Sequence, residues 1–97
     1  MARRRAPVHP GQTLHDKFMA PRGISSNRLG ETLNVPANRI SDIVRGRRGI
    51  TADTALRLAR HFRTTPEYWM DLQRDYELQV VSGEVGAEIK AIRMQKK

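Results

Sequence analysis

The most constraining feature of this sequence is a pair of short helical patterns, joined by a tight turn, between Ser26 and Arg45. Gly30 supplies a small residue where the two helix axes would approach most closely, and Asn34 supplies a residue that tolerates the positive φ of a turn. Apolar residues recur at helical spacing on both sides of this turn, and the anchors are Leu29, Leu33, Val35, Ile40 and Ile43. Together these elements predict a helix-turn-helix.

The patterns around this segment predict an all-α fold of five helices. Ser25 or Ser26 would cap the first helix of the pair, and Pro36 would start the second, because the N–H that proline lacks has no partner in a first helical turn. Thr51 would cap a later helix, and Thr65–Glu67 has the composition of a further helix start. The expected helices cover about 12–19, 25–33, 36–45 and 51–62, followed by a fifth that begins at 65.

The fifth helix carries large apolar residues along one face. Trp69, Leu72 and Tyr76 stand at positions i, i+3 and i+7, which places them together on an α-helix. We expect Trp69 to lie in the core of the domain. The better candidates for a dimer interface are Tyr76, Leu78, Val80 and Val81.

The two ends of the chain are expected to differ from its middle. Ser82 and Gly83 should interrupt the fifth helix, residues 84–94 could form a weak further helix, and residues 78–81 could form a short strand. Arg3–Arg5 could be an arm that contacts DNA or a tail that only adds solubility. The expected organisation is a flexible basic N-terminal arm, a helix-turn-helix domain and a C-terminal extension, covering residues 1–8, 9–78 and 79–97.

Charge is distributed unevenly and favours a polyanionic partner. The 97 residues carry a net charge of +8, and residues 1–48 contain ten basic residues against three acidic ones. This asymmetry points to nucleic acid near the N-terminal half. There is no cysteine, and no apolar run approaches the roughly 20 residues needed to cross a bilayer, so we expect a cytoplasmic protein without a membrane segment.

The outward face of the second helix of the pair carries the candidate base-reading residues. Arginine can make a bidentate contact to guanine and asparagine can do the same to adenine. The candidates on this face are Asn38, Arg39, Ser41, Asp42 and Arg45. Asp42 would repel phosphates, so it would either accept a hydrogen bond from cytosine or pair with a neighbouring arginine such as Arg39 or Arg45.

Phosphate contacts would surround that face. Helix starts and the loop bracketed by Gly46 and Gly49 are positions that commonly meet the DNA backbone. The candidates for these contacts are Ser26, Asn27, Arg47, Arg48 and Thr51.

The chain resembles the HigA-type antitoxins, a branch of the lambda-repressor-like XRE class of DNA-binding domains. The resemblance covers about residues 9–78 and rests on the helix-turn-helix together with the segments His9–Gly11, Val35–Ser41, Gly49–Ala59 and Thr65–Gln73. It departs from the wider class at Gly30, where alanine is usual, and at Asn34, where glycine is usual. Both residues still meet the steric need.

The resemblance implies a function as well as a fold. It implies a homodimer that binds double-stranded operator DNA and represses its own operon. It also implies neutralisation of a cognate HigB toxin, a RelE-like ribonuclease that cleaves mRNA on the ribosome. The alternatives are a stand-alone XRE-type repressor without a toxin partner and an interaction module that does not bind nucleic acid.

The sequence does not favour an enzyme. It contains no HExxH motif, no glycine-rich phosphate loop and no evident pair of nucleophile and base. His9, His15 and His61 do not have the spacing of metal ligands. We therefore expect neither a metal nor a cofactor, and a small ribonuclease is disfavoured because such folds need a strand platform.

Overall fold

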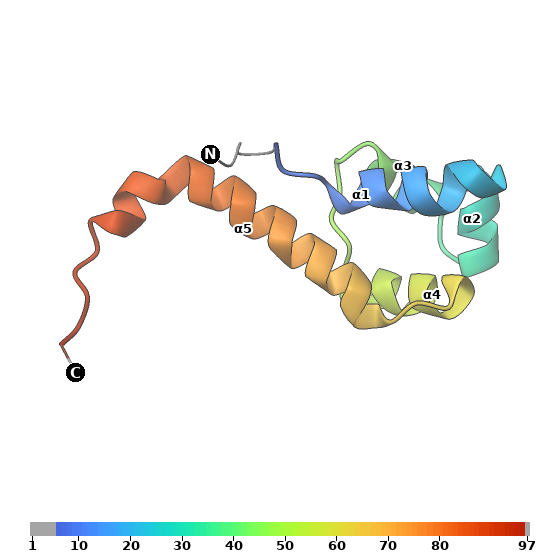
Figure 1. The fold of residues 1–97 in the computed structure, drawn as a ribbon. Helices are drawn as coiled ribbons and strands as arrows, with labels where there is room; N and C mark the ends of the chain where they lie inside the picture. The colour runs from blue at the N-terminus through green and yellow to red at the C-terminus, as the bar shows by residue number, and fades with distance from the viewer. Residues whose placement is uncertain (1–5, 97) are drawn as a thin grey trace.

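The computed structural model describes residues 6–96, and every regular element in that part of the chain is helical. Figure 1 shows short helices gathered into a bundle and a long last helix that leaves it. The expectation of an all-α fold with five α-helices is confirmed. The α-helices are α1 (Pro10–Thr13), α2 (Ser26–Leu33), α3 (Ala37–Val44), α4 (Ala52–Phe62) and α5 (Pro66–Lys90).

The first helical segment is longer than the predicted range of residues 12–19. It begins at Pro10, because the Nδ1 atom of His9 accepts a hydrogen bond from the backbone N–H of Gly11 at 2.9 Å and so caps the helix. After α1 the backbone continues as a π-helix (Leu14–Met19) and a 3-10 turn (Ala20–Arg22). Gly23 ends the segment in the left-handed conformation, with φ of 64°.

The helix-turn-helix forms as predicted from α2 and α3. The Ser25 hydroxyl caps α2 by accepting from the N–H of Arg28 at 3.1 Å, and Asn34 ends it with φ of 58°. A Cβ atom added to Gly30 would lie 3.0 Å from the carbonyl oxygen of Val35 and 3.1 Å from the Cα of Ala37. The small residue is therefore needed where the chain turns back against α2.

The helices enclose one aliphatic core around a single tryptophan. Trp69 is fully buried, as expected, and its Nε1 donates a hydrogen bond to Oγ1 of Thr64 at 2.7 Å. The ring of Phe18 lies against it, with 4.9 Å between the two centroids. The buried apolar residues are Leu14, Met19, Leu29, Leu33, Ile40, Ile43, Ile50, Ala55, Leu58, Ala59 and Trp69.

The last helix differs most from its predicted form. α5 runs for 25 residues through Ser82 and Gly83, so the predicted interruption there and the predicted strand at 78–81 are both wrong. The helix is instead kinked two residues later, at Val85, where non-helical φ and ψ of −120° and 16° separate two helical stretches. A glycine costs a helix only about 1 kcal/mol, which a long helix can absorb. No break in secondary structure marks the predicted boundary between residues 78 and 79.

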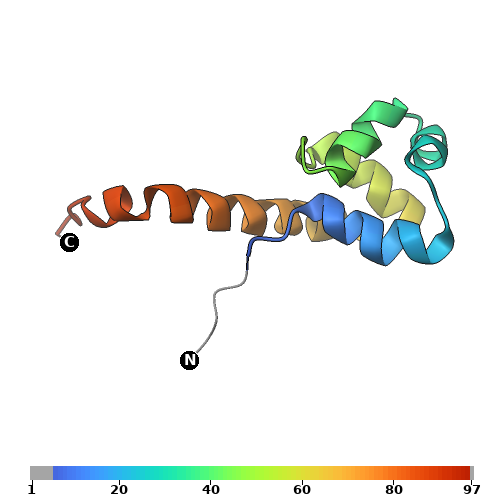
Figure 2. The ribbon, with the colours of Figure 1, turned by 90° about the horizontal axis from the view of Figure 1, so that it is seen from above.

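The C-terminal half of α5 extends beyond the bundle, as both views show (Figures 1 and 2). The radius of gyration is 16.3 Å and the principal extents are 52 × 30 × 22 Å. A compact domain of this length would have a radius of gyration of about 12.5 Å. Within residues 6–96, no helix is both long enough and apolar enough to span a membrane.

Candidate nucleic-acid interface

The outward face of α3 carries the predicted base-reading residues. Asn38, Ser41, Asp42 and Arg45 follow one another at helical spacing, opposite the buried side chains of the helix. Asn38 and Arg45 are exposed, whereas Ser41 and Asp42 are half-buried. The Ser41 hydroxyl donates to the backbone carbonyl of Asn38 at 3.3 Å, which keeps it close to the helix.

A groove joins this face to the start of α2. Its volume is about 300 Å³, and its polar lining includes Ser25 and Ser26 at the start of α2 with Ser41 of α3 and Arg45 at the end of that helix. The groove therefore brings one predicted phosphate-contacting residue, Ser26, next to two predicted base readers. Asn27, at the same end of α2, is exposed.

The loop after α3 folds back over that helix. Gly46 has φ of 76°, and the N–H of Arg47 donates to the carbonyl of Asp42 at 2.8 Å. This turn places Nη2 of Arg48 at 4.0 Å from Oδ2 of Asp42. Asp42 thus lies next to an arginine, as one of the two expectations for it had it, but the turn brings Arg48 of the loop to it rather than Arg39 or Arg45. Arg47 and Arg48 are both exposed.

Two polar side chains hold the end of this loop in place. The backbone N–H of Ile50 donates to Oε1 of Gln73 in α5 at 2.7 Å. Thr51 is exposed, but its hydroxyl caps α4 by accepting from the N–H of Thr54 at 3.4 Å. Gln73 is missing from the predicted site, since no local pattern connects it to a loop 23 residues earlier.

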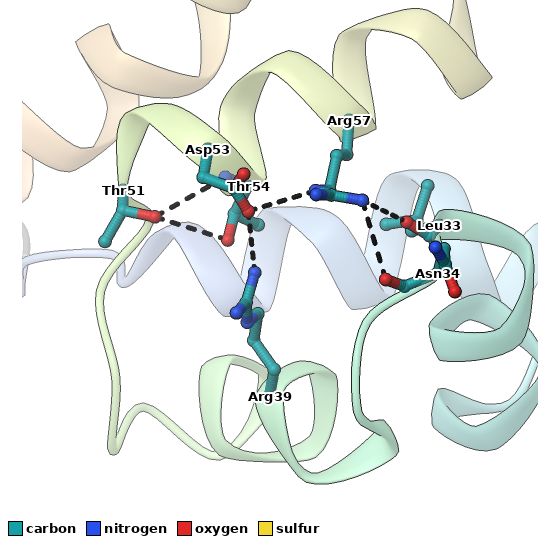
Figure 3. A network of polar contacts seen from close by, with 7 residues as sticks. All are labelled: Leu33, Asn34, Arg39, Thr51, Asp53, Thr54 and Arg57. Atoms are coloured by element: carbon teal, nitrogen blue, oxygen red, sulfur yellow. Dashed lines mark hydrogen bonds and ion pairs between the residues drawn. The ribbon is translucent and has the colours of Figure 1, made fainter.

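Arg39 does not extend freely from α3. Its Nη1 atom donates to Oδ2 of Asp53 in α4 at 2.7 Å, and 29% of its side chain is exposed (Figure 3). The same oxygen accepts from Nε of Arg57 at 3.0 Å. Arg57 in turn donates from Nη1 to the backbone carbonyl of Leu33, at the end of α2, at 2.8 Å.

This cluster of Arg39, Asp53 and Arg57 fixes the charge of its central carboxylate. The hydrogen bonds from Arg57 and then from Arg39 lower the pKa of Asp53 below its ordinary value of 3.8. Asp53 is thus negatively charged at neutral pH. The sequence shows the Asp53–Arg57 spacing of i, i+4, which is a common helical ion pair, but not the contact with Arg39.

The predicted dimer residues fall into two groups. The ring of Tyr76 packs edge-on against His9 of the same chain, with 4.8 Å between the centroids. Leu78 and Val81 have 60% and 49% of their surface exposed, and Val80 is half-buried. A groove of about 550 Å³ lies along this part of α5, beside Pro7. Tyr76 therefore packs within its own chain, whereas Leu78 and Val81 are largely uncovered.

The N-terminal residues before α1 form no regular element where the structure describes them. Residues 6–8 are irregular and exposed, and Arg3–Arg5 lie outside the described residues. Within 6–96, no group of three or more His, Asp or Glu side chains is arranged to hold a metal ion.

The sequence and the fold are both similar to known regulators. A family model described as helix-turn-helix matches residues 17–69. Virulence-associated protein I of Dichelobacter nodosus is 44% identical over 73 residues, which is 75% of this chain and 68% of that protein. Antitoxin HigA-1 of Vibrio cholerae is 37% identical over 76 residues, which is 77% of this chain and 70% of that protein.

A solved structure extends the similarity into α5. The antitoxin HigA of Pseudomonas aeruginosa, solved with the higBA promoter, superposes with a TM-score of 0.89 and 41% sequence identity. The match covers 93% of this chain and 99% of that one. The chain therefore belongs to the helix-turn-helix family of the XRE type and, within it, to the HigA-type antitoxins.

Proposed function

We propose that this protein is a cytoplasmic, sequence-specific repressor of its own operon that also neutralises a cognate toxin. The observation that carries the DNA-binding half is the arrangement of α3. Its buried face anchors it in the bundle, and its opposite face presents Asn38 and Ser41 beside the basic loop with Arg47 and Arg48. Arg39 stands at the edge of that face, on the side of α4. The related HigA of P. aeruginosa, whose structure includes promoter DNA, supports this proposal.

In the proposed complex α3 enters the major groove of operator DNA. Asn38 and Arg39 face base edges, where asparagine matches adenine and arginine matches guanine. Ser41, Asp42 and Arg45 complete the base-reading surface. The phosphate contacts come from the start of α2, the loop after α3 and the start of α4, through Ser26, Asn27, Arg47, Arg48 and Thr51. Such contacts set the register of the protein on the duplex.

We propose that the repressor is a homodimer joined through α5. The exposed apolar residues of this helix, Leu78 and Val81 among them, leave a surface that a second copy of the helix would cover. Two-fold symmetry would place the two copies of α3 one helical turn of DNA apart, about 34 Å, and the operator would be palindromic. Bound across a promoter, the dimer would block transcription.

The antitoxin half of the proposal is supported by the similarity of the chain to two antitoxins, HigA-1 of V. cholerae and HigA of P. aeruginosa. The partner would be a HigB-like, RelE-like toxin that cleaves mRNA. Co-expression tests it: this protein should relieve the growth arrest caused by a HigB-like toxin from a neighbouring gene. If growth arrest persists although both proteins are present, the protein is a stand-alone repressor.

The DNA-binding half is tested by comparing two arginine variants. Arg39→Ala should cost roughly 1 to 3 kcal/mol on operator DNA and relax its sequence preference, because it removes a base contact. Arg47→Ala should weaken binding to operator and random DNA equally, because it removes a phosphate contact. Gel-shift titrations measure both. An Arg39→Ala protein that binds the operator as the wild type does would show that Arg39 is not a reader.

Salt dependence provides an independent check. Contacts to about six to ten phosphates should make the affinity fall by roughly 10³- to 10⁵-fold between about 50 and 200 mM salt. Absence of any operator shift at low salt would instead indicate an interaction module that does not bind nucleic acid.

A further inference from the structure

In the part of the chain that the structure describes, Asp53 has the only carboxylate that joins a predicted base reader to another helix. Its Oδ2 atom accepts from Nη1 of Arg39 at 2.7 Å and from Nε of Arg57 at 3.0 Å (Figure 3). Asp53 is the second residue of α4, whereas Arg39 is the third residue of α3. The contact therefore spans the two helices.

Asp53 is itself held by the turn of the helix-turn-helix. Arg57 binds Asp53 through Nε and also donates from Nη1 to the carbonyl oxygens of Leu33 at 2.8 Å and Asn34 at 3.5 Å. These carbonyls lie at the end of α2, where they lack partners within that helix. Arg57 thus connects Asp53 to the same turn that sets the angle between α2 and α3.

The contact restricts Arg39 without blocking its ability to read a base. A free arginine side chain has many rotamers, and ordering it on binding weakens the complex. Its bond to Asp53 uses Nη1, and the guanidinium fork has a second edge formed by Nε and Nη2. That edge can still donate to O6 and N7 of guanine. Asp53 would thus order the side chain of Arg39 in the free protein, before DNA is bound.

The carboxylate has a second effect because it carries charge. Asp53 is 54% exposed and lies beside the proposed duplex surface. A negative charge there disfavours phosphates of any sequence, whereas its contact with Arg39 favours one base. The charge of Asp53 would therefore weaken non-specific binding, whereas its contact with Arg39 would strengthen specific binding.

We propose that Asp53 is a positioning residue that determines base specificity by orienting the guanidinium of Arg39 toward the duplex; this inference rests on the proposed DNA-binding function. It does not require Asp53 to touch DNA. The alternative is that the Arg39–Asp53 pair only fastens α3 to α4, and the experiment below separates the two roles.

The test compares Asp53→Asn with a matched control. Glu67→Gln removes the same kind of charge from the second position of α5, where it meets no base reader, so both variants lose one favourable interaction with a helix N-terminus. The probe is the duplex that the wild type selects from a library with about 20 randomised base pairs, which is two helical turns. Its single-base variants and a scrambled duplex complete the set, and urea unfolding of each protein is measured in parallel.

Asp53→Asn should lower the preference for the selected duplex over the scrambled one by about tenfold, the scale of ordering one long side chain. Its affinity for the scrambled duplex should be unchanged or higher. The loss should fall on the same base pair at which Arg39→Ala loses discrimination. In the Arg39→Ala background, Asp53→Asn should have no further effect on preference. Glu67→Gln should keep the wild-type preference.

Each contrary result identifies what has failed. A full preference in Asp53→Asn, an equal loss on all duplexes, or a loss that persists in the Arg39→Ala background would overturn the positioning role while the proposed repressor function stands. If Arg39→Ala keeps the wild-type preference, Arg39 is not a reader and the inference falls with it. If the wild type selects no sequence at all, the proposed function itself is wrong.

Discussion

Gly11 lies against the backbone of Ile43, so that α1 and α3 meet without an intervening side chain. A Cβ atom built on Gly11 would overlap the carbonyl oxygen of Ile43 and lie 2.6 Å from its carbonyl carbon. Both residues are buried. The proposed recognition helix is thus fixed from behind by the first helix, at a distance that only glycine permits.

Gly11→Ala should therefore destabilise the protein by about 3 kcal/mol or more, because backbone atoms would have to move apart. Gly83→Ala is the matched control. It lies inside α5 with no atom within 4 Å of an added Cβ, and should stabilise the helix by roughly 0.5 to 1 kcal/mol. Urea unfolding measures both. A Gly11→Ala protein as stable as the wild type would show that α1 and α3 can separate without cost.

Gln73→Ala should destabilise the protein by about 1 to 3 kcal/mol. The variant leaves the N–H of Ile50 without its acceptor, and Ile50 is only 3% exposed. The loop with Arg47 and Arg48 precedes this bond, so binding to all DNA sequences should weaken together with stability. Gln12→Ala removes an exposed glutamine and should change neither measurement. Equal unfolding midpoints for the two variants would contradict the role of Gln73.

Acid should destabilise the protein through His9. Burial lowers the pKa of His9 below the ordinary histidine value of 6.5. Between these two values the unfolded chain binds a proton that the folded chain does not, so this contribution to stability is complete above pH 6.5 and declines as the pH falls toward the folded pKa. His9→Asn cannot titrate there, yet asparagine can cap α1. Thermal unfolding of the variant should thus depend less on pH in this window, and an unchanged slope would exclude His9.

Leu78→Glu should dissociate the proposed dimer, because it places a charge in the apolar contact of α5. Leu56→Glu is a matched control on α4, since Leu56 and Leu78 are 59% and 60% exposed. Analytical ultracentrifugation should give a dimer for the wild type and for Leu56→Glu, and a monomer for Leu78→Glu. A monomeric wild type, or a dimeric Leu78→Glu protein, would remove α5 as the interface.

The features that were predictable from the sequence depend on neighbouring residues. The capping serine, Gly30 and Asn34 each act within a few positions, so the helix-turn-helix could be located to within about one residue. Ser82 and Gly83 misled the prediction because weak helix formers are read as a stop. Together they destabilise a helix by only about 1 to 2 kcal/mol, which a helix of 25 residues tolerates.

The features that were missed join distant segments. Asp53 binds Arg39 across 14 positions and Gln73 binds Ile50 across 23, and neither pairing leaves a periodic pattern in the sequence. The start of α1 was predicted two residues late for a different reason, since histidine, which caps it, is not among the preferred capping residues. The surface of α3 could be anticipated, but the side chains that support it from behind could not.

The length of α5 has a consequence for the operator rather than for the protein. In the proposed dimer, the separation of the two copies of α3 depends on where along α5 the partners cross. Sliding that crossing point by one turn would move each copy of α3 by about 5.4 Å relative to the two-fold axis. The separation would change by up to about 10.8 Å, roughly three base-pair steps of 3.4 Å. The position of the crossing point along α5 would then set the spacing of the two half-sites. Relatives with the same α3 but a shifted apolar stripe on α5 would read the same bases at a different half-site spacing.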